Sequence, residues 1–201
     1  MTAGTPIDLS RLPTTTIGHR SMMWWGTLGF VIIEGSTLLV LAFSYIYLAR
    51  NFDSWPPAHV PPPSPGVFGV QAAVMLLSLV PMILVDRGAR RVDLRTVRWG
   101  MVIVCAFAIA TCVLRGFELR ALNVRWDSSA YGSVAWGVLV AHATLLLLET
   151  AESLVFTAVL FKPDLEERDL SAASDNAIYW YFLTLTWLPL GGLVFLSPYF
   201  M

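Results

Sequence analysis

Five long apolar runs, separated by short charged stretches, make up most of this chain. An α-helix needs about 20 apolar residues to cross a hydrocarbon core of roughly 30 Å, and each run has about that length. The runs are Met22–Leu48, Val67–Val85, Val97–Phe117, Tyr131–Phe161 and Ala177–Phe200. The sequence therefore predicts an all-α polytopic membrane protein, a bundle of five transmembrane helices.

The composition agrees with a membrane protein that has one domain. Hydrophobic residues make up 56% of the chain and charged residues 13%, whereas a soluble domain carries about 25% charged residues. We predict a single membrane domain over residues 22–201, preceded by a tail over residues 1–21. The first run is longer than the apolar region of a cleavable signal peptide, so we expect it to be retained. The net charge of −1 gives no indication of nucleic-acid binding.

The basic residues are distributed unevenly between the two faces that five spans define. Nine lie on the N-terminal side: Arg11, Arg20, Arg87, Arg90, Arg91, Arg95, Arg98, Lys162 and Arg168. Four lie on the other side: Arg50, Arg115, Arg120 and Arg125. The positive-inside rule then places the N-terminus in the cytoplasm and the C-terminus outside. Tryptophans near the span ends are expected to anchor at the headgroups; they are Trp24, Trp25, Trp99, Trp126 and Trp180.

Few residues in this chain could hold a redox cofactor. Of the three histidines, only His142 lies within a run, and haem or copper sites need several imidazoles or thiolates. Cys105 and Cys112 are seven residues apart, about 10 Å along a helix, which is too far for a disulfide. We expect them to pack in a helix interface. Phosphate-binding loops, nucleophile elbows and zinc-protease motifs are absent from the sequence, so no catalytic residue or metal site is predicted.

Acidic residues inside the runs are the exceptions to this apolar character. Glu34 lies near the middle of the first run, where an acidic residue costs about 2.5 to 3.5 kcal/mol to insert, and it should face other helices. Glu149 and Glu152 are three apart and so share one helix face. Burial favours a neutral carboxyl. A proton-holding group is one interpretation, and a hydrogen-bonded strut between helices is the other; a di-metal site would lack other ligands.

Several motifs occur in an order that resembles subunit III of haem–copper cytochrome c oxidases, in the five-helix bacterial form. The resemblance covers about Trp24 to Phe200. It rests on Phe30-Val31-Ile32-Ile33-Glu34, Trp55-Pro56-Pro57, Phe117-Glu118, Asp127 with Tyr131-Gly132-Ser133, His142, and Tyr179-Trp180-Tyr181-Phe182 with Trp187. Three positions depart from the family pattern: Leu145 and Tyr181 replace histidines, and Thr184 replaces an aspartate. Glu149 and Glu152 are outside the pattern.

The resemblance implies an accessory subunit of a bacterial inner-membrane oxidase. Such a subunit packs on subunit I, binds phospholipid, and supports proton uptake and durable turnover. Haem and copper would reside in partner subunits I and II, which would handle cytochrome c and oxygen. We expect proton-related or buried polar roles for Glu34, Glu118, His142, Glu149 and Glu152. Lipid headgroups are expected near a basic cluster, with solvated orientation charges as the alternative; the cluster is Arg87, Arg90, Arg91, Arg95 and Arg98.

Three other functions remain open at this point. A related small subunit accompanies nitric oxide reductases, and this chain could be one. A stand-alone proton-coupled transporter would use the acidic residues within the runs, although no inverted repeat is visible. A lipid-modifying enzyme would use His142 with a carboxylate, but it would lack a nucleophile or a metal.

Overall fold

Five long helices form the fold. The computed structural model describes residues 18, 21–163, 165 and 167–200. The helices are α1 (Met22–Asn51), α2 (Pro65–Arg90), α3 (Leu94–Ala121), α4 (Ala130–Leu160) and α5 (Glu167–Leu196), followed by the short 3₁₀ helix η2 (Ser197–Tyr199). Each long helix includes a span long and apolar enough to cross a membrane. The prediction of an all-α bundle of five transmembrane helices is confirmed, and the chain is a multi-pass membrane protein.

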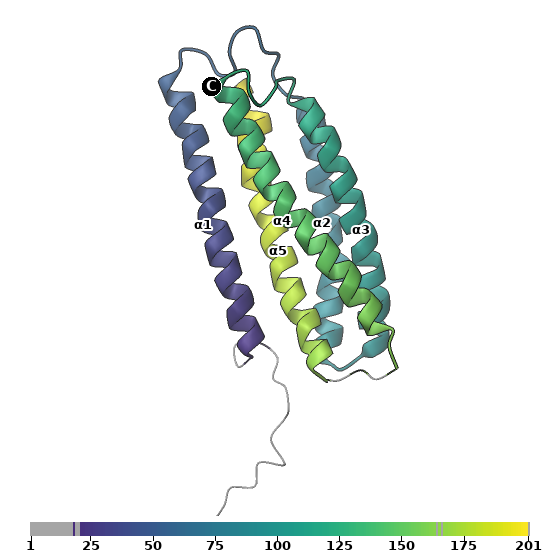
Figure 1. Ribbon diagram of the computed structural model, residues 1–201. Coiled ribbons are helices and arrows are strands. Elements are labelled where there is room, and N and C mark those ends of the chain that lie inside the picture. Colours follow the sequence, from purple (N-terminus) through teal and green to yellow (C-terminus); the bar gives the residue numbers. More distant parts are fainter. Residues whose placement is uncertain (1–17, 19–20, 164, 166, 201) are drawn as a thin grey trace, which may run out of the picture.

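The helices run alternately up and down, as short connections require (Figure 1). The start of α1, the α2–α3 connection and the start of α5 therefore lie at one end of the bundle. Helix α2 packs most extensively on α3 and α5, whereas α1 contacts α4 and α5. Helix α1 is thus at the side of the bundle, next to α4 and α5.

Side-chain caps explain where three helices begin. Ser21, Asp93 and Ser129 precede α1, α3 and α4, and each accepts a hydrogen bond from a backbone N–H of the first turn, at 3.1 to 3.2 Å. Helix α2 begins with Pro65, whose missing N–H costs nothing at this position. The caps determine the residue at which each helix begins, which the apolar runs predict only approximately.

Helix α5 begins at Glu167 and not at Ala177, where the predicted run starts. The additional turns contain Ser171, Ser174, Asp175 and Asn176, which are polar and buried. Ser174 bonds to Asp86 and Arg90 of α2, and Asn176 bonds to Glu149 and Ser153 of α4, contacts that a hydropathy pattern along the chain does not detect. The fifth helix is therefore more polar inside the bundle than the sequence predicts.

The core contains two tryptophans of α5, Trp180 and Trp187, both fully buried. Trp180 donates a hydrogen bond from Nε1 to Oγ of Ser78 on α2, at 2.8 Å. Its predicted role as an interfacial anchor is wrong, because its ring packs between helices. By contrast, Trp25, Trp99 and Trp126 are exposed, as anchors at the headgroups require.

The two cysteines lie in the α3–α4 interface, as predicted. Cys105 Sγ lies 3.1 Å from Oγ1 of Thr157, and Cys112 Sγ lies 3.3 Å from Oγ1 of Thr150. Both thiols are free.

Candidate functional site

A cavity of about 470 Å³ lies between α1, α4 and α5, near the end of the bundle where α1 begins. Its wall combines apolar side chains with four carboxylates, and no Lys or Arg is among the described residues that line it. The carboxylates are Glu34, Glu149, Glu152 and Asp175, and we call this space the acidic cavity. Three of the four are residues that the sequence singles out, so the fold brings Glu34 of α1 to the Glu149 and Glu152 pair of α4.

Glu34 faces the other helices, as its cost in lipid requires. The side chain is half-buried, and its Oε2 accepts a hydrogen bond from the hydroxyl of Tyr179 on α5. Tyr179 itself belongs to the last motif of the sequence. The contact fixes the carboxyl at the inner end of the acidic cavity, about 18 Å along α1 from Met22 at 1.5 Å per residue.

Glu149 is the most enclosed of the glutamates in the cavity wall. It is 3% exposed, and its Oε1 accepts hydrogen bonds from Nδ2 of Asn176 at 2.7 Å and from Oγ of Ser153 at 3.3 Å. Asn176 also donates to Ser153, at 3.1 Å. Glu152, one turn further along α4, is exposed. The pair therefore consists of a buried, hydrogen-bonded carboxyl and an exposed one.

Asp175 is a member of the site that the sequence analysis missed. Its side chain lines the cavity but is only 4% exposed, and neither carboxylate oxygen has a hydrogen-bond partner among the described residues. A buried carboxylate without partners is costly. It lies outside the predicted apolar run, so the pattern gave no signal for it.

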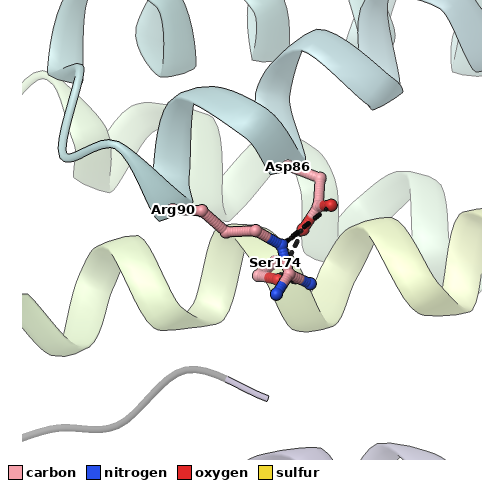
Figure 2. A network of polar contacts seen from close by, with 3 residues as sticks. All are labelled: Asp86, Arg90 and Ser174. Carbon is pink, nitrogen blue, oxygen red and sulfur yellow. Dashed lines mark hydrogen bonds and ion pairs between the residues drawn. The ribbon is translucent and has the colours of Figure 1, made fainter.

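The polar network in Figure 2 holds the first turns of α5 against α2. Arg90 donates from Nε to both carboxylate oxygens of Asp86 at 3.1 Å, and Ser174 donates to Oδ1 of Asp86 at 2.6 Å. Arg90 also donates from Nη2 to Oγ of Ser174, at 3.2 Å. Since successive helix residues point in directions about 100° apart, fixing Ser174 towards α2 leaves Asp175 free to line the cavity.

A second buried cluster lies nearer the other end of the bundle and is centred on Arg115 of α3. Its Nη1 donates to Oε2 of Glu118 at 2.7 Å, and its Nη2 lies 3.0 Å from Nδ1 of His142 on α4. The guanidinium carbon lies 3.7 Å from the ring centroid of Trp187 on α5. His142 Nε2 lies 3.0 Å from the carbonyl oxygen of Leu183. We call Arg115, Glu118, His142 and Trp187 the arginine cluster.

The burial of Arg115 changes the number of basic residues counted on the outer face. Arg115 is 3% exposed and Glu118 is fully buried, so Arg115 is not one of the basic residues of the outer face. With Nη2 facing Nδ1, His142 accepts from Arg115 there and donates from Nε2 to Leu183, because a guanidinium carries only donors. The i,i+3 spacing of Arg115 and Glu118 is the sequence signal that could have predicted this pair.

The fold separates His142 from Glu149. The two residues are seven apart on α4, about 10 Å along its axis, and they contact different neighbours. His142 belongs to the arginine cluster and Glu149 to the acidic cavity. A proton path that links these two residues directly has no support in their contacts.

The basic residues predicted to meet lipid headgroups lie at the end of α2 and the start of α3. Arg87, Arg91 and Arg95 are exposed. Arg90 bonds to Asp86, and Arg98 donates from Nε to the carbonyl oxygen of Leu160, at 2.6 Å. In the orientation count, Arg11 and Arg20 lie outside the described residues, as does the side chain of Arg168. A role in lipid binding stays a prediction.

Within the described part of the chain, no group of three or more His, Cys, Asp or Glu side chains could hold a metal ion. No protein-family model matches the sequence, and no curated protein matches it. The site is therefore interpreted from its chemistry: an acidic cavity between α1, α4 and α5, and a buried arginine cluster that ties three helices together.

Proposed function

We propose that the chain is an accessory subunit of a respiratory haem–copper oxidase, of the subunit III type. Oxygen reduction belongs to subunits I and II, which carry haem and copper and receive electrons from cytochrome c. This chain packs on subunit I in the bacterial inner membrane, with its N-terminus in the cytoplasm. It binds phospholipid and supports proton uptake and stable turnover.

The observation that carries the proposal is that residues of separate motifs contact one another. Glu34 accepts a hydrogen bond from Tyr179. Trp55 of the outer loop packs edge-on against Tyr131, with ring centroids 5.1 Å apart. Motifs that resemble a family only by chance would not be expected to contact one another. These contacts therefore support a fold shared with that family.

The arginine cluster adds three further motif residues to this set. Glu118, His142 and Trp187 come from α3, α4 and α5, and all three contact Arg115. His142 and Trp187 also contact each other, with ring centroids 5.1 Å apart. The cluster has the form of a structural core and not of a reaction site, which suits an accessory subunit.

The acidic cavity supports a role in proton uptake. Four carboxylates line one space near the end of the bundle that we place in the cytoplasm. Acidic side chains inside a membrane domain are typical of proton relays. We infer that this group supports proton uptake, and Glu34 is the member that also belongs to the motifs of the family resemblance.

Co-purification tests the proposal. The chain carries an affinity tag, the membranes are extracted in mild detergent, and visible spectra and mass identification of companions follow. We expect a Soret band from a haem-containing companion and no such band from the isolated chain. A chain that purifies from its native membrane without a haem protein would contradict the proposal.

Two of the alternative functions are tested in different preparations, the first in the co-purified complex and the second in liposomes. A companion that reduces nitric oxide and not oxygen would make the chain an accessory of a nitric oxide reductase. The acidic cavity also suits a proton-coupled transporter, since intramembrane carboxylates mark such sites. Proton-driven transport by liposomes that contain only this chain would favour that function.

A further inference from the structure

We propose that the acidic cavity binds an organic ammonium ion that carries an apolar chain. This inference names the ligand chemistry of a cavity that the proposed function uses, so it rests on that proposal. Glu149, Glu152 and Asp175 carry it, and none of the three belongs to the motifs behind the family resemblance.

The cavity wall offers carboxyl groups with which a bound cation can pair. Two of its carboxyls already have donors, because Tyr179 donates to Glu34 and Asn176 donates to Glu149. Asp175 has no hydrogen-bond partner among the described residues although it is 4% exposed. The charge of Arg90, on the neighbouring helix, acts on Asp175, but Arg90 forms its hydrogen bonds with Asp86 and Ser174. Asp175 is therefore a buried hydrogen-bond acceptor without a donor among the described residues.

The arrangement of the carboxylates favours a large cation over a metal ion. A metal ion needs several ligand atoms within about 2.0 to 2.6 Å, and no three metal-binding side chains come close enough within the described part of the chain. The carboxylates instead line a space of about 470 Å³, which is within the usual range for small-molecule sites. An ammonium group in such a space contacts several carboxylates without being coordinated by them.

The remaining wall suits an apolar chain attached to the ammonium group. Met22, Met23, Phe30 and Leu148 line the cavity beside the carboxylates. Phe30 and Tyr179 supply aromatic rings, which attract ammonium ions. The cavity reaches from the first turn of α1 to Glu34, so an amphiphile can keep its head near Glu152 and Asp175 and its chain along α1. Both the amine of a lipid headgroup and a free alkylammonium have this chemistry.

A binding measurement tests the inference with the full chain alone, in nanodiscs of phosphatidylglycerol. Titration with hexylammonium is followed by calorimetry, and hexanol and hexanesulfonate serve as ligands with the same apolar chain. We expect saturable binding of hexylammonium only. Asp175→Asn and Glu152→Gln should each weaken it about tenfold. Asp53→Asn, which removes the same charge from an exposed loop position, should leave the affinity unchanged.

Two results would overturn the inference: hexylammonium that binds no better than hexanol, or an equal loss of affinity in Asp53→Asn. If Asp175→Asn fails to fold, Glu152→Gln decides, because Glu152 is exposed and its loss disturbs no packing.

Nanodiscs with added phosphatidylethanolamine identify the source of the ammonium ligand. If phosphatidylethanolamine competes with hexylammonium, the natural ligand is a lipid headgroup. If it does not compete, the natural ligand is a free amphiphile. Because no partner subunit is present, failure here is distinct from failure of co-purification.

Discussion

Tyr179 of α5 donates a hydrogen bond from its phenol to Oε2 of Glu34, across the interface between α5 and α1. Helix α1 lies at the side of the bundle, and the acidic cavity opens beside this contact. One oxygen of the Glu34 carboxyl is therefore fixed by Tyr179, and both residues line the acidic cavity. This contact is where the proposed role in proton uptake can be tested by substitution.

Glu34→Gln should leave assembly intact and impair proton uptake. The amide keeps the shape of the side chain and an oxygen that accepts from Tyr179, but it cannot take up a proton at neutral pH. We expect normal haem content in the purified oxidase, with slower turnover or faster inactivation. Oxygen consumption and proton release from reconstituted vesicles measure this effect.

Tyr179→Phe is the matched control for the Glu34 variant. It removes the donor but keeps the carboxyl, so proton uptake should be less affected than in Glu34→Gln. If Glu34→Gln equals the parent in turnover, proton release and inactivation rate at every pH tested, Glu34 is a structural strut and its proposed role must be withdrawn.

Glu118→Gln should destabilise the bundle strongly. The substitution leaves the guanidinium of Arg115 buried without its counter-charge, and breaking a buried ion pair from one side costs about 3–5 kcal/mol. The stacked ring of Trp187 offsets part of this cost. Thermal unfolding of the detergent-solubilised chain measures the loss.

The double variant Arg115→Met with Glu118→Leu separates charge from packing. Replacing both partners by apolar residues of similar size removes the unpaired charge, so part of the stability should return, although Nδ1 of His142 then loses its donor. Asp127→Asn breaks the exposed pair between Asp127 and Arg125 and should change stability little. Equal losses in Glu118→Gln and Asp127→Asn would contradict this account of the arginine cluster.

The apolar runs predict the helices well, because a helix in lipid must satisfy its backbone hydrogen bonds within itself. The pairing of Glu34 with other helices also follows from sequence, since an exposed carboxyl at that depth is too costly. Likewise, i,i+3 spacing is enough to place Glu149 and Glu152 on one wall. These predictions depend only on neighbours along the chain and on the properties of the bilayer.

The errors involve partners that are distant in sequence. The position of Trp180 near a span end predicts an anchor at the membrane interface, but its N–H bonds to Ser78 on α2. Asp175 and Asn176 are polar and so lie outside the predicted span, but both are buried, and Asn176 donates to Glu149 of α4. Hydropathy along the sequence does not reflect contacts between helices. It therefore predicts that each buried polar residue lies outside the membrane.

Cysteine labelling tests the orientation that the basic residues predict. Ser64 and Arg91 are exposed and lie in connections at opposite ends of the bundle. We expect Ser64→Cys to react with an impermeant maleimide in intact cells, and Arg91→Cys to react only after the membrane is opened. The background should have Cys105 and Cys112 replaced by alanine. Labelling of Arg91→Cys alone in intact cells would reverse the topology.

Asp93 provides a pH-dependent contribution to stability outside the membrane spans. It caps α3, and its pKa lies below the usual value of 3.8 because Thr96 donates hydrogen bonds to the carboxylate from its hydroxyl and from its backbone N–H. A carboxylate at a helix N-terminus is also favoured by the helix dipole. The folded chain therefore binds this proton less readily than the unfolded chain does.

The sign of the pH effect follows from that difference. The stabilisation by Asp93 is complete above the unfolded pKa and is lost as the pH falls through the lower folded pKa. In Asp93→Asn the amide oxygen still accepts from the N–H of Thr96, but nothing titrates. The parent should therefore have the higher unfolding temperature near neutral pH, and the difference between parent and variant should shrink below about pH 4. Thermal scans in detergent from about pH 2 to 7 measure it, and a difference that stays constant or grows on acidification would show that the charge of Asp93 does not stabilise the helix.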